Sequence, residues 1–94
     1  GGDGRWPALA VDGRDGEVVV SWSGEAPPDA AIEWLALDAL QARPLPQDEV
    51  EQVVPEPDAR EVAVRADARA RVTARWVVDA PGGVVTGPWV EVQP

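Results

Sequence analysis

Few side chains in this sequence could perform covalent catalysis. The chain has no histidine, its eight basic residues are all arginines, and 17 residues are acidic. A serine or threonine nucleophile needs a base within hydrogen-bond reach, so only a carboxylate could activate Ser21, Ser23, Thr73 or Thr86. Paired carboxylates for glycoside hydrolysis need a substrate cleft, which a domain of this size seldom forms. We therefore expect no enzyme activity and no catalytic residue.

Metal and cofactor sites are not indicated either. The stretch DGRDGE (12–17) lacks the D-x-[DN]-x-[DN]-G spacing and the distal glutamate of a calcium loop. The absence of cysteine excludes a disulfide framework and a thiolate metal site. The sequence also has no glycine-rich phosphate loop. We predict neither a metal nor a cofactor.

The charge of the chain disfavours nucleic acid as a partner. Its formal net charge is −9, whereas phosphate contacts need clustered positive charge. Arg65, Arg69, Arg71 and Arg75 do cluster, and we interpret them as a solvated strand face. No apolar run approaches the ~18 residues of a membrane-spanning helix, so membrane insertion is not expected. The sequence leaves the compartment unknown.

The apolar residues recur with a period of two, which is typical of strands with one buried face. Turn residues interrupt this pattern at 12–16 (DGRDG), 24–29 (GEAPPD) and 80–83 (APGG). Glycine permits a positive φ there, and proline removes a ladder donor. We expect strands within residues 9–12, 17–23, 31–40, 60–66, 70–80 and 87–94, with a short edge strand at 50–54.

One segment is compatible with two structures. AIEWLALDAL (31–40) is rich in alanine and leucine, which favour a helix. The prolines on both sides and the alternation of Ile32, Trp34 and Ala36 favour a strand. We interpret the segment as a strand that turns these three residues inward.

Together these elements predict an all-β fold. About seven short strands in a chain of this length are typical of a two-sheet antiparallel β-sandwich of the immunoglobulin-like kind. We expect residues 6–94 to form one such domain, and residues 1–5 to be a linker or a remnant of cloning. Strand parity predicts a core made of Leu9, Val11, Val18, Val20, Trp22, Ile32, Trp34, Val62, Val64, Val72, Ala74, Trp76, Val90 and Val92.

The order of these motifs resembles a fibronectin type III domain over nearly the whole chain. The family's first three strands are similar to the motifs P-x-L-x-V (7–11), V-x-V-x-W (18–22) and I-x-W-x-A (32–36) of this chain. A later strand of the family is similar to the motif A-x-V-x-A (70–74). The resemblance implies an immunoglobulin-like sandwich in which Trp22 is the buried tryptophan of the second strand.

The chain also departs from that family. The tyrosine that begins the family's late strand falls on Ala70, or on Ala68 in another register. VRADA (64–68) stands where the family has its leucine and its L-x-P-G turn. A remote immunoglobulin-like relative is therefore an alternative.

A further set of residues is expected on the outer face of one sheet. If Trp34 points inward, its neighbours along the strand point outward, and Trp89 opposes the parity of Val90. Exposed apolar groups beside arginine are typical of protein interfaces. We predict a partner-binding surface of Leu35, Leu37, Arg75, Val77 and Trp89. Alternatively, these side chains pack beneath the acidic, proline-rich segment that follows the third strand.

Two functions fit these expectations. The first is a non-catalytic fibronectin type III-like module, a spacer or protein-interaction domain of a larger, bacterial-looking protein, whose partner is a neighbouring domain or another protein. The resemblance favours an extracellular or cell-surface location for it. The second is an accessory carbohydrate-binding module that stacks Trp6 or Trp89 on a sugar. Coplanar exposed rings would favour the sugar, and a ring isolated in a flat patch would favour a protein.

Overall fold

The architecture is known from a computed structural model. It describes residues 6–14, 17–36, 44, 50–64 and 71–91. Two of the predicted residues, Leu37 and Val92, lie outside these ranges, as do Arg65, Arg69 and the whole of the predicted linker, 1–5.

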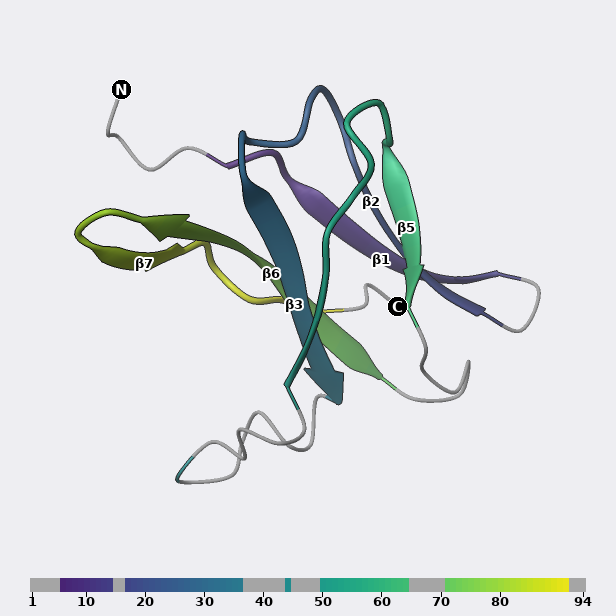
Figure 1. Ribbon diagram of the computed structural model, residues 1–94. Coiled ribbons are helices and arrows are strands. Elements are labelled where there is room, and N and C mark those ends of the chain that lie inside the picture. The colour runs from purple at the N-terminus through teal and green to yellow at the C-terminus, as the bar shows by residue number, and fades with distance from the viewer. Residues whose placement is uncertain (1–5, 15–16, 37–43, 45–49, 65–70, 92–94) are drawn as a thin grey trace.

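The described residues form β-strands and turns (Figure 1). The segment 31–40 carries alternating apolar residues between proline-containing flanks, and its described part, residues 31–36, lies in a strand. The strands are β1 (Leu9–Arg14), β2 (Glu17–Trp22), β3 (Ala30–Ala36), β4 (Glu51–Val53), β5 (Glu61–Val64), β6 (Val72–Ala80), β7 (Gly83–Thr86) and β8 (Val90–Glu91).

These strands form two antiparallel sheets that pack face to face. Sheet A has the order β1-β2-β5, and sheet B has the order β4-β3-β6-β7, with β8 also paired to β6. The predicted all-β, two-sheet antiparallel sandwich of about seven strands is confirmed. In sheet A the β1–β2 register joins Arg14 to Glu17, so β1 extends two residues beyond the predicted 9–12.

The last two strands, β7 and β8, pair with different parts of the same side of β6. Residues 72–78 of β6 pair with β3 on one side, so β7 and β8 share the other side. Val77 pairs with Thr86, and continuing that register would place residue 89 opposite Ala74. Val90 lies there instead. The one-residue offset is a bulge at 87–89, and it sets the parity of Trp89.

The core lies between the sheets and is built mainly from valine and tryptophan. Trp22 of β2 and Trp76 of β6 meet edge to face, with ring centroids 5.1 Å apart and an interplanar angle of 74°. Trp22 is 6 % exposed and Trp76 is 1 % exposed. Trp22 is therefore part of the core and is not a platform for a ligand.

Most of the predicted core residues lie in this cluster. Val62 and Val90 are partly buried and pack against it. The fully clustered ones are Leu9, Val11, Val18, Val20, Trp22, Ile32, Trp34, Val64, Val72, Ala74 and Trp76.

Some burial was not anticipated from parity. Val19 stands on the outer face of sheet A, between Asp12 and Ala63, yet it is only 5 % exposed. Ala30 also belongs to the core cluster, and it has the parity of Ile32 and Trp34 but lies one residue before the predicted strand 31–40. β7 was also missed, because the short run GVVT lies between a turn and Pro88 and all four of its residues are exposed.

Candidate functional site

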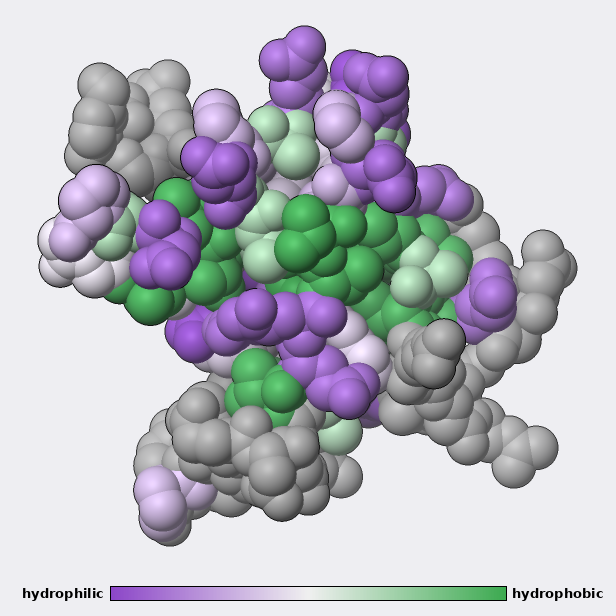
Figure 2. All heavy atoms as spheres, in the orientation of Figure 1, coloured by the Kyte–Doolittle hydropathy of each residue, from purple (hydrophilic) through white to green (hydrophobic). Residues whose placement is uncertain are grey.

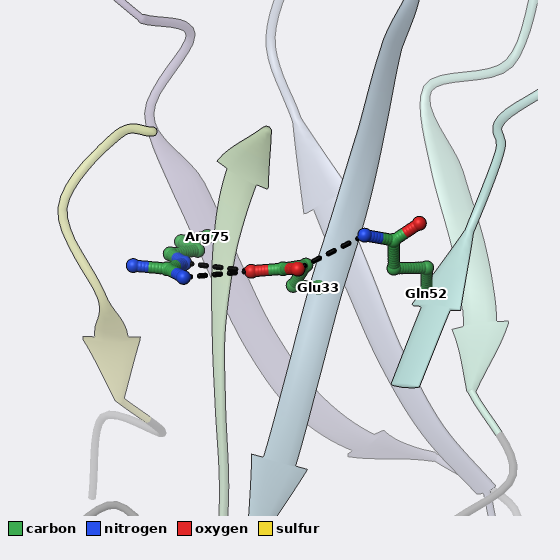
Figure 3. A network of polar contacts seen from close by, with 3 residues as sticks. All are labelled: Glu33, Gln52 and Arg75. Carbon is green, nitrogen blue, oxygen red and sulfur yellow. Dashed lines mark hydrogen bonds and ion pairs between the residues drawn. The ribbon is translucent and has the colours of Figure 1, made fainter. Parts of the chain in front are cut away.

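The outer face of sheet B carries a polar network that crosses three strands. Arg75 of β6 donates from its Nε to Glu33 Oε1 of β3 at 2.9 Å, and the Nη2 of Arg75 lies 2.8 Å from the same oxygen. Gln52 Nε2 of β4 donates to Glu33 Oε2 at 2.9 Å. Figure 3 shows Glu33 between the other two side chains. Its carboxylate thus joins strands that are far apart in the sequence.

Trp89 extends this network toward the edge of the sheet. The guanidinium carbon of Arg75 lies 4.3 Å from the centroid of the Trp89 ring, within the range of a cation–π contact. The Trp89 side chain is half-buried, and the Arg75 and Glu33 side chains are 24 % and 14 % exposed. Arg75 is therefore fixed between a carboxylate and an aromatic ring while it still reaches solvent.

Two of the five residues predicted to form an open partner-binding surface are not open. Leu35 is 0 % exposed and Val77 is 6 % exposed. Leu35 pairs with Thr73, which is also 0 % exposed, and both have the strand parity of Glu33 and Arg75. Since this burial is produced by the chain itself, the prediction that Leu35 and Val77 are available to a partner is wrong. Arg75 and Trp89 remain, and Leu37 lies outside the described residues.

Trp6 packs at the end of the sandwich. The indole Nε1 of Trp76 donates to the Pro7 carbonyl at 2.8 Å, which ties the N-terminal segment to β6. Trp6 lies over Gly87, which donates its own backbone N–H to the Trp76 carbonyl at 2.9 Å. The half-buried Trp6 therefore closes this end of the fold.

Gly87 should resist substitution because the Trp6 ring occupies the space of its missing side chain. A Cβ at Gly87 would meet three ring atoms of Trp6 at 3.1–3.3 Å. We expect Gly87→Ala to displace Trp6 and lower the free energy of unfolding by about 1–2 kcal/mol. Urea denaturation measures this change. Gly82→Ala is the control, because nothing lies within 4 Å of its Cβ position. Equal effects of the two substitutions would contradict the packing of Trp6 on Gly87.

A depression of about 220 Å³ lies on the same outer face, beside β7. Acidic side chains surround it: Asp29, Glu33 and Asp79 line it together with Val77 and Val84, and also Ala31 and Gln52. Asp29 stands in a turn in which Ala30 N donates to the Pro27 carbonyl at 3.2 Å, and its φ of 58° is unusual for a residue other than glycine. This part of the face is therefore apolar at its floor and negative at its rim.

A second hollow, of about 390 Å³, opens between the sheets on the flank formed by β4 and β5. Trp34, Val53 and Val64 contribute apolar groups to it, and Glu51 and Gln52 contribute polar ones. Figure 2 shows hydrophobic residues in a band across the middle of the side seen in Figure 1, with hydrophilic residues above and below. The apolar lining of this hollow thus comes from core residues, Trp34 and Val64, and from Val53, which packs against them.

The hydroxyl groups considered as nucleophiles lie on or beside three different strands, β2, β6 and β7. Thr73 is buried and its Oγ1 donates to the Val90 carbonyl at 3.1 Å, so that it anchors β8. Ser21 lies in β2, Ser23 follows the last residue of that strand, and Thr86 is exposed on β7. Within the described ranges, no three acidic residues are grouped as a metal site. Nor does this part of the chain contain a helix long and apolar enough to cross a membrane.

Sequence reasoning identified Arg75 and Trp89 but missed Glu33, Gln52 and the valines of β7. Val84 is 64 % exposed and Val85 is 49 % exposed. Glu33 alternates with Ile32 and Trp34, and this parity could have placed it beside Arg75. Comparison with known proteins adds no relative: no family model, no curated protein and no solved structure matches the chain.

Proposed function

We propose that this chain is a non-catalytic, fibronectin type III-like module that binds a protein partner through the outer face of sheet B. The observation that carries the proposal is the position of Arg75, held by Glu33 against the ring of Trp89 on a partly exposed sheet face. Tryptophan and arginine are enriched among the anchors of protein interfaces. Because both are ordered before a partner arrives, less side-chain entropy is lost on binding.

The strand order supports the family resemblance as part of this proposal. The first, second and fifth strands form one sheet, and the third, fourth, sixth and seventh form the other. A sandwich of this kind can present one sheet face while its ends connect to neighbouring domains. A larger parent chain that uses the module as a spacer is compatible with the same arrangement.

The tryptophans favour a protein over a carbohydrate as the partner. Arg75 lies over one face of the Trp89 ring, and Trp6 packs on Gly87. Both rings are half-buried and belong to different contacts. Stacking on a sugar needs an open ring face, so a partner that uses Arg75 and Trp89 together fits better.

Site-specific photo-cross-linking tests the proposal. A p-benzoylphenylalanine that replaces Val84, which is exposed on the outer face of sheet B, should cross-link a protein when the natural full-length protein is irradiated in its source cells. The matched control replaces Ala10, which is exposed on sheet A. Adding Trp89→Ala should lower the yield at position 84 at least about fivefold. Equal yields at both positions, or no protein product at either, would overturn the proposal.

A further inference from the structure

β7 is an open sheet edge. It ends the strand order of sheet B, and among the described residues it pairs only with β6. All of its residues are exposed, including the hydrophobic Val84 and Val85. Figure 1 shows the β6–β7 hairpin extending away from β5 and the rest of sheet A. Unpaired edges of this kind can take up another strand.

The register of the hairpin shows which backbone groups point outward. Gly87 donates its N–H to the carbonyl of Trp76, which lies opposite it in the β6–β7 register. Antiparallel pairs alternate between bonded and non-bonded along a ladder. The next bonded pair is therefore Val78 with Val85, so the N–H and C=O groups of Val84 and Thr86 point away from β6.

The acidic depression adjoins this edge. Val84 pairs with Asp79 and shares the outer face with it, and both line the depression together with Asp29. Asp29 and Asp79 are exposed. Glu33 is already paired with Arg75, so among the described residues that line the depression Asp29 and Asp79 are the acids without an ion pair. The whole chain carries a charge of −9, which disfavours a second copy of itself as the occupant.

We propose that β7 takes up an extended, basic segment of a partner protein as an additional strand of sheet B. This inference rests on the proposed function and specifies the chemistry of its partner. The segment would bond to the outward backbone groups of Val84 and Thr86. Side chains on one face of it would lie beside Val84. A lysine there would lay its aliphatic stem over the valine methyl groups and extend its ammonium group toward Asp79.

A capped heptapeptide of alternating lysine and valine is the probe for this mode. Adding it to the isotopically labelled chain should shift the backbone amide resonances of β7 and of no strand in sheet A. The amides of Val84 and Thr86 should exchange rapidly with solvent in the free protein and slow at least about fivefold in the complex. Val85 should exchange slowly in both states, since its amide already bonds to β6. This pattern distinguishes strand addition from adsorption of a basic peptide.

Thr86→Pro tests the outward hydrogen bonds. Proline removes an N–H that the β6 ladder does not use, and the preceding Val85 is already in the extended conformation that proline requires. We expect the peptide to bind at least about tenfold more weakly. Thr86→Val is the matched control, because it keeps the N–H and the branched shape. Slow exchange of Val85 in both variants would show that the hairpin is intact.

Asp29→Asn combined with Asp79→Asn tests the charge. Asparagine keeps the size of each side chain and tolerates the positive φ of residue 29. We expect peptide affinity to fall about three- to tenfold and to depend less on salt. Glu17→Gln, at an exposed position of the distant β1–β2 hairpin, should leave affinity unchanged. A heptapeptide of alternating glutamate and valine should not bind.

The outcomes separate this inference from the proposed function. Suppose that the photo-reactive residue at position 84 cross-links a protein, but the lysine peptide does not bind and Thr86→Pro does not lower the cross-linking yield. Strand addition is then wrong, and the proposed function stands. Equal binding of the lysine and glutamate peptides would exclude a basic occupant. A dimer of the chain alone that Thr86→Pro abolishes would identify a second copy as the occupant and would also overturn the inference.

Discussion

Replacing Trp22 by alanine should lower the free energy of unfolding by about 3–5 kcal/mol. Trp22 is 6 % exposed, packs edge to face on Trp76, and has its backbone N–H bonded to the Arg60 carbonyl at 3.0 Å. Truncation would leave a cavity at the centre of a core that has no phenylalanine, tyrosine or methionine to fill it. A domain of this size is stable by about 5–14 kcal/mol, so a large part of its stability would be lost. Thermal and urea denaturation followed by far-ultraviolet circular dichroism measure the effect.

Trp22→Phe is the matched control for this prediction. The Trp22 indole Nε1 is buried and has no hydrogen-bond partner among the described residues. Phenylalanine removes this unsatisfied donor and keeps an aromatic ring, so the loss should be smaller than for alanine by at least about 1.5 kcal/mol. A Trp22→Ala variant with the melting temperature of the wild type would contradict the core position of this side chain.

The core could be predicted from the sequence because it depends on local alternation. Val18, Val20 and Trp22 have one parity within a single strand, and the turn residues on either side set the limits of that strand. Such a pattern needs no knowledge of which strands are neighbours. Val19 shows the limit of the method, since it is buried on the face that alternation assigns to solvent.

The candidate site depends on contacts that the sequence does not reveal. Arg75 and Glu33 are separated by 42 residues and meet because β3 and β6 are adjacent in one register. Gln52 itself lies in the acidic, proline-rich segment, whose sequence does not indicate the register in which β4 pairs with β3. Trp89 could be placed on the outer face because it precedes Val90, which was predicted to face inward. The bulge at 87–89 shifts β8 by one residue relative to β7, so the face of Trp89 follows from β8 and not from β7.

The burial of Leu35 reverses the result expected from a substitution there. Taken as an exposed interface residue, Leu35 could carry a charge at little cost in stability. In the structure, however, it is 0 % exposed and lies opposite Thr73, which is also 0 % exposed. The surrounding chain would have to separate to hydrate a carboxylate at this position, or the carboxylate would have to take up a proton.

Leu35→Glu should therefore destabilise the fold by about 4 kcal/mol or more, because it combines the loss of a buried leucine with the burial of an ionisable group. Urea denaturation at neutral pH measures the change. Val84→Glu is the matched control: it introduces the same charge on the same face of sheet B at a side chain that is 64 % exposed, and should alter stability by at most about 0.5 kcal/mol. If Leu35→Glu unfolds at the same urea concentration as Val84→Glu, Leu35 faces solvent, and the original five-residue surface regains its place as the candidate interface. A large difference between the two variants instead assigns Leu35 to the folding of the chain, so that any loss of association in Leu35→Glu would report unfolding and not a lost contact.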